Sequence, residues 1–385
     1  MPDTLIIGAG PFGLSLAAHL GHCGDDYLVV GKPMEFWEKN MPDGMFLRSN
    51  TDWHLDVNER NTIAEFINQQ NLSEEQTSPL SLDIYLQYAR WFIEQTNINI
   101  KPAYVKDLKQ LSDGFVATLT DDSTIEAKRV IVAVGFKYFE YTPASFLEWL
   151  PKDYYSHTCH TVDLEIYRNK RVLIVGGRQS AFEWAALLHE KGAKEVQLTY
   201  RHATPDFAIS DWTWVEELVN NMAEDPTWFR TLSVEDKEKY RARLWAEGRL
   251  KIEYWLKDRI NKNNVHLHPN TEIVKNVLTP NGAVMVWLSN GDSFETDHII
   301  LATGYKVDVE HLPFINSSLL TALRYSNGFP ELDAHLQSNI PGLFFTSFMA
   351  AQDFGPFFGF TIGVRTAAKL IADGIKLHKH SYAVK

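Results

Sequence analysis

Two apolar runs, each followed at once by a glycine-rich turn, organise the pattern of hydrophobic and polar positions along this chain. The first run covers Thr4–Ile7 and the second covers Arg171–Val175. A short apolar run without alternation is typical of a strand in a parallel sheet that is covered on both faces. The apolar, alanine-rich stretch after the first turn predicts a helix packed on that sheet, and a second helix is expected after Ser180.

The rest of the pattern predicts the elements that complete two such βαβ units. Residues 80–97 have the spacing of an amphipathic helix, and residues 103–134 alternate as antiparallel strands do. Asn290 and Gly291 predict the turn of a hairpin within 283–301. The other expected elements are parallel strands at Tyr27–Val30, Arg129–Val134 and Glu195–Tyr200, a long functional loop at 33–60, and a strand, a Gly/Phe-rich loop and a final helix within 342–375.

The order of these elements predicts an α/β fold with two Rossmann-like dinucleotide-binding domains of the three-layer ββα type. The second unit lies between the parts of the first, so we expect it to be inserted there. The first domain would comprise residues 1–160 and 305–385, and the second would comprise residues 165–304. Residues 211–262, which are rich in tryptophan, are expected to form a helical insertion in the second domain, either as a substrate lid, a dimer surface or ordinary core.

Composition and charge narrow the function classes. The chain has 385 residues and a net charge of −12, which argues against a nucleic-acid-binding surface. No apolar run reaches the roughly 18 residues that would span a bilayer, so neither nucleic acid nor membrane is an expected partner. The two cysteines, Cys23 and Cys159, are far apart, which favours a reduced, cytoplasmic protein. Disulfide-reducing flavoproteins need a closely spaced cysteine pair, and the chain has none.

The first turn reads Gly8-Ala9-Gly10-Pro11-Phe12-Gly13. In this fingerprint the first glycine permits a tight turn, the second lets the backbone approach a pyrophosphate, and the third lets helix and strand pack closely. The helix that follows would face the phosphates with the positive end of its dipole. The acidic residue usually found after the second strand is replaced by Gly31, and Glu35 is the candidate to contact the ribose instead.

The second turn reads Gly176-Gly177-Arg178-Gln179-Ser180-Ala181, so Arg178 stands where the first turn has its middle glycine. The guanidinium there would either clamp a pyrophosphate or block its space, and we favour the clamp because Gly177 could steer the side chain outward. Alanine in the third position, Ala181, is common where NADP binds. Arg201, after the next strand, suits the 2′-phosphate of NADP, and a solvated charge at the strand end is the alternative role.

These residues resemble the flavin-containing (class B) monooxygenases and their N-hydroxylating and Baeyer–Villiger relatives. The resemblance implies FAD on the first turn, NADPH on the second, and activation of O2 as a flavin C4a-hydroperoxide that oxygenates a small organic substrate. The linker motif of that family is mostly missing around His157, where Pro151, Asp153 and Thr161 replace its other members. The motifs that carry the resemblance are Gly8-x-Gly10-x-x-Gly13, Phe36-Trp37, Gly135, Gly176 to Ala181 followed by Glu183, and Leu301-Ala302-Thr303-Gly304-Tyr305.

The candidate site residues follow from these motifs. Arg48 and Asn50 lie in the long loop that should approach the flavin ring, and Gln352 and Asp353 precede the last helix, so these four are the candidates for catalysis. Loop anchoring or core packing is the alternative role for each. The other candidates, as cofactor-binding residues, are Gly8, Gly10, Pro11, Phe12, Gly13, Glu35, Trp37, Gly135, Gly176, Gly177, Arg178, Gln179, Ser180, Ala181, Arg201, Thr303, Gly304 and Tyr305.

Several alternatives stay open on the sequence alone. His266 and His268 alternate on a strand without a third ligand, so no metal site is expected. An FAD-dependent NAD(P)H oxidase or reductase without oxygen insertion is the second interpretation, and a flavin-binding sensor without turnover is the third. The substrate, the oxygenated atom and the oligomeric state are not predicted, although a homo-oligomer is compatible with the sequence.

Overall fold

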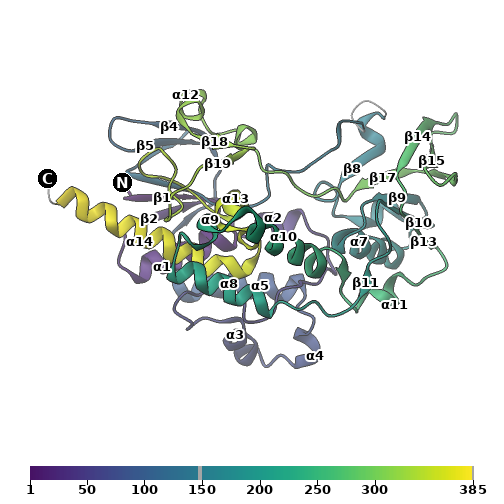
Figure 1. Ribbon diagram of the computed structural model, residues 1–385, viewed down its shortest axis with the longest axis horizontal. Helices are drawn as coiled ribbons and strands as arrows, with labels where there is room; N and C mark the ends of the chain where they lie inside the picture. Colours follow the sequence, from purple (N-terminus) through teal and green to yellow (C-terminus); the bar gives the residue numbers. More distant parts are fainter. Residues whose placement is uncertain (146–149, 384–385) are drawn as a thin grey trace.

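Each glycine-rich turn follows the carboxyl end of a central strand in a five-stranded parallel sheet. The computed structural model describes residues 1–145 and 150–383. The first sheet has the order β20-β7-β1-β2-β3, and the second has the order β13-β10-β9-β17-β8. Every neighbouring pair in both sheets is parallel. The two sheets form separate lobes, which Figure 1 shows side by side.

The strands of the two sheets are short and mostly buried. In the first sheet, all four residues of β1 and of β7 are buried, as the continuous apolar runs predicted. The strands of the first sheet are β1 (Thr4–Ile7), β2 (Tyr27–Val30), β3 (Ile100–Lys101), β7 (Arg129–Val132) and β20 (Leu343–Phe345). Those of the second are β8 (Tyr155–His157), β9 (Arg171–Val175), β10 (Glu195–Tyr200), β13 (Val265–Pro269) and β17 (His298–Leu301).

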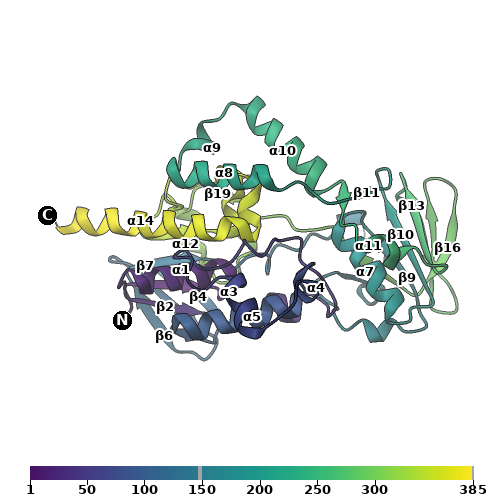
Figure 2. The same cartoon turned by 90° about the horizontal axis from the view of Figure 1, so that it is seen from below.

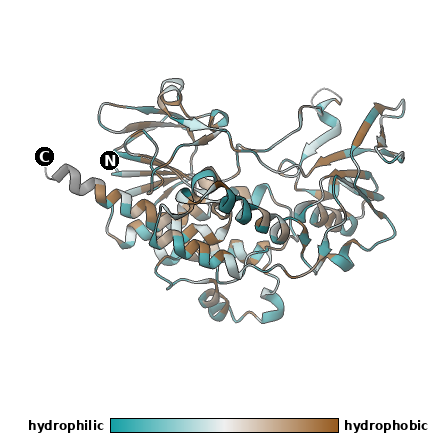
Figure 3. Ribbon diagram, in the orientation of Figure 1, coloured by the Kyte–Doolittle hydropathy of each residue, from teal (hydrophilic) through white to brown (hydrophobic). Residues whose placement is uncertain are grey.

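Both lobes have three layers, because the two faces of each parallel sheet are covered differently. In the second lobe, Ile174 packs with helix α7, whereas its neighbour Leu173 packs with strand β15 on the opposite face. In the first lobe, α1, α5 and α14 cover one side and an antiparallel sheet lies on the other (Figure 1). These covering helices carry hydrophobic and hydrophilic residues side by side (Figure 3). The predicted ββα architecture is confirmed.

The covering elements match the periodic segments of the sequence. The helices are α1 (Pro11–His22), α5 (Leu82–Thr96), α7 (Gln179–Glu190), α11 (Leu256–Ile260) and α14 (Val364–Ala383), with α2 (Glu35–Lys39), α3 (Ile63–Gln70), α4 (Glu74–Thr77), α12 (Ser317–Ala322) and α13 (Ala351–Phe354) as shorter ones. The antiparallel sheets are β4 (Val105–Gln110), β5 (Phe115–Leu119) and β6 (Thr124–Ala127), and β14 (Ile273–Leu278), β15 (Val284–Leu288) and β16 (Ser293–Thr296). Small two-stranded pairs are β11 (Asp206–Phe207) with β12 (Lys251–Ile252), and β18 (Tyr325–Ser326) with β19 (Phe329–Pro330).

The tryptophan-rich insertion leaves the second sheet but packs on the first lobe. It contains α8 (Thr213–Glu224), α9 (Trp228–Thr231) and α10 (Val234–Gly248). Figure 2 shows α8 beside α14, and α10 leading back toward the second lobe. Trp214, Leu218 and Met222 are buried in the core of the first lobe. The helical character of 211–262 is therefore confirmed, but this part of the chain bridges the two lobes.

Besides the insertion, segments around Tyr141 and Gly304 run between the lobes, and they lie against each other. The amide of Tyr141 donates to the Gly304 carbonyl at 2.9 Å, and Glu140 forms an isolated bridge with Tyr305. Strand β8 pairs with β17, so residues 155–157 belong to the second sheet, whereas the sequence assigned residues up to 160 to the first domain. Within the described part of the chain, no helix is both long and apolar enough to cross a membrane.

Candidate functional site

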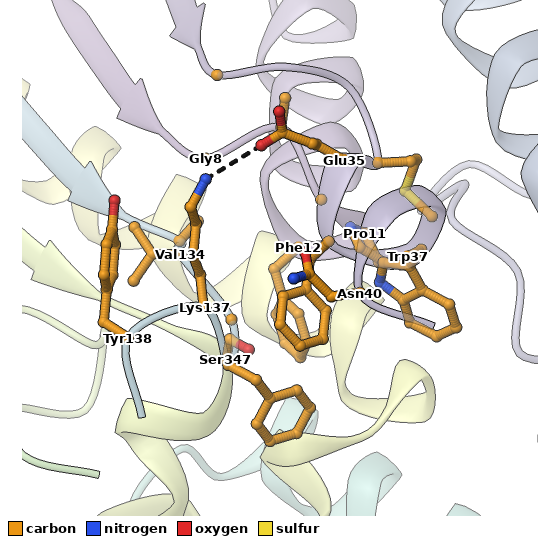
Figure 4. A pocket seen from close by; sticks show the side chains of 18 of the residues that line it. Gly8, Pro11, Phe12, Glu35, Trp37, Asn40, Val134, Lys137, Tyr138 and Ser347 are labelled. Carbon is orange, nitrogen blue, oxygen red and sulfur yellow. Dashed lines mark hydrogen bonds and ion pairs between the residues drawn. The ribbon is translucent and has the colours of Figure 1, made fainter. Parts of the chain in front are cut away.

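A cavity of about 320 Å³ lies in front of the first glycine-rich turn. Its walls include Gly8, Gly10 and Phe12 from the first turn and Ser180 and Trp184 from helix α7 of the second lobe. Figure 4 shows Phe12, Trp37, Asn40 and Lys137 around this space. The first turn and the start of the second lobe's helix α7 therefore line one cavity. Other predicted residues among its walls are Pro11, Glu35, Trp37, Gly135, Gly304 and Tyr305.

The first turn is built for close approach. A Cβ atom on Gly13 would lie 1.9 Å from the Gly8 carbonyl oxygen, so only glycine lets helix α1 pack on the turn. A Cβ on Gly10 would meet nothing within 4 Å, because this position faces the cavity. Gly10 is also the N-cap of α1, whose first amides point into the same space. These residues fit the pyrophosphate of a dinucleotide.

Charged and aromatic side chains gather at the side of the cavity where Gly31 replaces the expected acid. The Glu35 carboxylate contacts the ammonium groups of Lys137 at 3.1 Å and Lys32 at 3.3 Å. Burial would raise the pKa of Glu35, but hydrogen bonds and charges from Lys137 and Lys32 outweigh it and lower this pKa. The Lys137 ammonium also lies 3.7 Å from the ring centre of Tyr104. Glu35 is thus a charged acceptor on the cavity wall, as contact with a ribose requires.

Aromatic rings form much of the remaining wall. Phe136 lies 4.8 Å from Tyr305 and 4.8 Å from Phe348, measured between ring centres. Tyr305 also contacts Phe36 at 6.2 Å and is largely buried, which raises its pKa. A wall of this kind excludes water from a bound ring system.

The second turn has the same register as the first, but its surroundings differ. Arg178 is the N-cap of α7, as Gly10 is of α1. Its guanidinium lies 4.0 Å from the ring centre of Trp245 on α10. The glycine with a positive φ is Gly176, at 149°, and a Cβ on Gly177 would lie 2.4 Å from that of Tyr200. Our expectation that Gly177 steers Arg178 is therefore wrong, and Trp245 contacts it instead.

The other predicted residues of the second nucleotide site differ in burial and in their contacts. Arg201 is exposed just after β10, and Ala181 is fully buried in α7. Gln179 accepts from the Glu253 amide at 3.0 Å, and the Thr303 hydroxyl donates to the Tyr141 carbonyl between the connecting segments. Neither Gln179 nor Thr303 lines the cavity.

Arg48 and Asn50 do not line the cavity. The guanidinium of Arg48 contacts the Glu253 carboxylate at 2.8 Å, the Gly248 carbonyl at 2.7 Å and the Ser210 hydroxyl at 2.5 Å. It therefore joins the long loop of the first lobe to the end of the insertion. Asn50 is exposed, and its carbonyl accepts from the amide of Trp53. Met45, at the start of the same segment, is the member that reaches the cavity.

Gln352 and Asp353 also lie away from the cavity. The Gln352 amide donates to the Ser326 hydroxyl at 3.0 Å, and Asp353 accepts from the Leu332 amide at 2.9 Å. Both side chains anchor the segment around β18 and β19. Phe360 and Thr361, which come later in the same segment, reach the cavity instead.

His157 and His160 lie at the connection between the lobes. The ring of His157 contacts the Cys159 thiol at 3.0 Å and the Gly304 carbonyl at 3.0 Å, and burial lowers its pKa. The Glu140 carboxylate, the Cys159 thiol and the His160 ring form a group with the ligand types that a metal ion uses. His160 already contacts Glu140 at 2.6 Å. The sequence did not suggest this group, because its members come from two separate segments.

Sequence reasoning missed several residues of the cavity wall. Lys137 and Tyr104 follow different strands and carry no motif. Thr158 stands beside the lobe connection, and Asn40, whose amide donates to the Cys159 carbonyl at 2.8 Å, closes the long loop's first helix. The missed wall residues include Lys32, Met34, Asn40, Met41, Tyr104, Phe136, Lys137, Tyr138, Thr158, Trp184, Phe314, Ser347 and Thr361.

Family models place this architecture among known proteins. Two models described as pyridine nucleotide-disulphide oxidoreductase match residues 5–242 and 236–347. The chain belongs to this family. It is a flavin-dependent oxidoreductase, and the expectation of FAD with a pyridine nucleotide is confirmed at the level of the family.

Individual relatives resemble the chain over different extents. Ferredoxin–NADP reductase 1 from Listeria monocytogenes is 35% identical over 123 residues, which are 31% of this chain and 35% of that protein. The first curated relatives are matched over about a third of their length or less. An ornithine N-hydroxylase from Kutzneria sp. 744 has a TM-score of 0.79 at 14% identity, covering 98% of this chain and 100% of that one. A bacillithiol disulfide reductase from Staphylococcus aureus has a TM-score of 0.65 at 20% identity, covering 98% and 99%.

The two cysteines lie in different surroundings and do not form a pair. Cys23 is exposed after α1, whereas Cys159 is buried at the lobe connection. Burial, and then the charge of Glu140, raises the pKa of the Cys159 thiol to about 12, which disfavours the nucleophilic thiolate. The family's nucleotide-binding architecture is present without a redox pair of cysteines.

Proposed function

We propose that this protein is an NADPH-dependent FAD monooxygenase that acts on a small organic molecule. The observation that carries the proposal is the shared cavity, whose walls come from the Gly8 turn and from Ser180 and Trp184 of the second lobe. FAD on the first turn and NADPH on the second would bring flavin and nicotinamide into this space. Bound FAD supplies the chemistry of accepting a hydride and activating O2.

The protein's own residues would bind and orient the FAD and shield its ring system from water. Gly10 leaves room for the FAD pyrophosphate, and the first amides of α1 would donate to it. Glu35, held by Lys137, would accept from the ribose hydroxyls. Phe12, Trp37 and Phe360 would cover the ring system and keep water out.

Two of the solved structures with this fold support oxygenation as the chemistry. The Kutzneria protein is named an ornithine N-hydroxylase, and a cadaverine monooxygenase from Erwinia amylovora has a TM-score of 0.74 at 16% identity. The second candidate function is a reductase that passes electrons to an acceptor without oxygen insertion. The Listeria sequence match favours that candidate, because the protein it matches is named a ferredoxin–NADP reductase.

Product analysis tests the proposal. Purified protein would first be reduced with NADPH without air and then mixed with isotopically labelled dioxygen and a panel of small amines, thioethers and ring compounds. A monooxygenase transfers one labelled oxygen atom to a panel member, and the yield of hydrogen peroxide per NADPH falls when that compound is present. Peroxide at full yield with every compound, or rapid electron transfer to added ferredoxin, would contradict oxygenation and favour the reductase.

A further inference from the structure

Four arginines form a series from the second lobe to the first. Arg201 follows strand β10, Arg178 caps helix α7, Arg249 follows helix α10, and Arg48 lies in the long loop of the first lobe. Contacts of helix α10 determine the positions of Arg178 and Arg249 in this series. Trp245 lies over Arg178 at 4.0 Å, and the Arg249 amide donates to the Trp245 carbonyl at 3.0 Å. Arg249 is thus one helical turn from the residue that covers Arg178, and the charge of Arg178 acts on it.

Arg48, at the other end of the series, also contacts the end of helix α10. The Arg48 guanidinium donates to the carbonyl of Gly248, the residue directly before Arg249, at 2.7 Å. Burial, followed by the charges of Arg178 and Arg48, lowers the pKa of Arg249 to about 10. Burial and the charge of Arg201 lower the pKa of Arg178. Each inner arginine therefore has cations as its charged neighbours.

Nearby acids do not balance these charges. Glu253 is taken by Arg48 at 2.8 Å, and Glu247 contacts Lys251 at 2.6 Å. Among the described residues, the guanidinium groups of Arg178 and Arg249 have no hydrogen bond or ion pair with a protein group. Gathering partly buried cations without an anion is costly, so the arrangement favours a ligand that carries several negative charges.

The helix start adds to this preference. Helix α7 has 12 residues, and Arg178 is its N-cap without a side-chain capping hydrogen bond. The first amides of such a helix favour a phosphate. The ring of Trp245 holds the Arg178 side chain beside this helix start through a cation–π contact. Because the side chain is already ordered, it would lose less conformational entropy when a phosphate binds.

We propose that the insertion completes the second nucleotide site, with Arg249 and Arg178 binding the pyrophosphate of NADPH between them. Arg201, at the outer end of the series, binds the 2′-phosphate. This inference rests on the proposed function, in which the second turn holds NADPH. Because α8 of the insertion packs on the first lobe, a nucleotide held by Arg249 is positioned relative to the flavin as well as to its own lobe.

Equilibrium binding of oxidised coenzymes to the FAD-loaded protein tests this inference without turnover. Arg249→Ala should weaken the binding of both NADP⁺ and NAD⁺ at least tenfold, because both carry the pyrophosphate. FAD content and thermal stability should stay as in the wild type. Arg249→Gln keeps length and polarity without the charge and should show the same loss, which covers the case of a poorly folded alanine variant. Arg241→Ala is the matched control, since Arg241 lies on the same helix and pairs with Glu238 at 3.2 Å.

The other outcomes separate the two proposals. Wild-type affinity for both coenzymes in both Arg249 variants would overturn the role of the insertion and leave the proposed function standing. A loss confined to NADP⁺ would overturn the assignment of Arg249 to the pyrophosphate. Failure of the wild type to bind NADP⁺ or to be reduced by NADPH would instead overturn the proposed function.

Discussion

Gly10 and Arg178 occupy the same place in two turns of the same register, yet they meet different surroundings. Gly10 faces a cavity that would accommodate a pyrophosphate against bare backbone, whereas Arg178 lies under Trp245 from an insertion that the first turn lacks. The third glycine of the first turn, Gly13, corresponds to Ala181, which differs by one methyl group. If both turns hold a dinucleotide, as we propose, the first would bind phosphate by close approach of the backbone and the second by added cations.

Substitution at the third glycine position, Gly13 in the first turn and Ala181 in the second, should give the largest difference in stability between the turns. Gly13→Ala would push a Cβ to 1.9 Å from the Gly8 carbonyl, so helix α1 would have to move away from the first sheet. We expect a loss of about 3 kcal/mol or more in the free energy of unfolding, or no folded protein at all. Chemical denaturation measures this loss.

Two variants serve as controls for that prediction. Gly10→Ala should fold normally, because its Cβ meets no atom within 4 Å, but should hold FAD at least about tenfold more weakly. Ala181→Gly should cost only about 1 kcal/mol, from helix propensity. Equal unfolding free energies for Gly13→Ala and Gly10→Ala would contradict the account of the first turn.

Among the buried equivalent positions of the helices after the turns, Ser15 corresponds to an acid, Glu183. Burial, only partly offset by the Phe46 amide and by Arg259, raises the pKa of Glu183 from its ordinary value of 4.5 to about 7. The folded state thus holds this proton more tightly than the unfolded chain does. The resulting stabilisation is complete below about pH 4.5 and is lost as the pH rises toward 7.

Glu183→Gln should remove this pH dependence. The amide oxygen can still accept from the Phe46 amide, so the variant should be more stable than the wild type above pH 7 by on the order of 3 kcal/mol. Unfolding free energies measured across this pH range check the slope. The control is Glu217→Gln on helix α8, an exposed acid without an ion pair to Arg259, which should keep the wild-type slope. A parallel pH profile for Glu183→Gln and wild type would rule out the raised pKa.

Coenzyme choice should depend on Arg201. A charge-assisted hydrogen bond to the 2′-phosphate contributes about 1.5–3 kcal/mol, so Arg201→Ala should lower kcat/KM for NADPH roughly ten- to a hundredfold. The value for NADH should hardly change, because NADH lacks that phosphate. Steady-state kinetics with both coenzymes measure this split, and equal losses would reject the assignment.

Arg178 should have the smallest effect, because Arg249 and the helix amides would share its ligand. Arg178→Gly gives the second turn the middle glycine that the first turn has, and it should weaken NADPH binding by about tenfold or less. The dependence of flavin reduction on NADPH concentration gives the apparent Kd. Tighter binding or faster reduction in this variant would show that Arg178 blocks the site and would favour an enzyme reduced by another donor.

The sequence predicted the local parts of this fold well and the long-range parts poorly. The strands at Tyr27–Val30, Arg171–Val175 and Glu195–Tyr200 have the predicted bounds, because each lies at the expected place in a βαβ unit and carries apolar residues. The packing of the insertion on the first lobe was missed, since a helical pattern does not reveal which surface its apolar face covers. Strand β8, with three residues, has no pattern of its own.

The site shows the same division. The glycines of the first turn were predicted because their spacing has a mechanical reason, and Glu35 was found on the cavity wall as expected. Arg48 was expected near the flavin by its place in the loop, but the distant Glu253 determines where its side chain lies. Lys137 was missed because its contact with Glu35 joins residues that lie far apart in the sequence.

A crystal structure of the protein with both FAD and NADP⁺ would test the central claim most directly. We expect the FAD pyrophosphate against Gly10 and the amides of α1, and the NADP⁺ pyrophosphate between Arg178 and Arg249, with Arg201 on the 2′-phosphate. The nicotinamide and flavin rings would meet in the cavity beside Ser180. FAD absent from the first turn, or NADP⁺ bound away from Arg178, would contradict the assignment of two cofactors to the two turns.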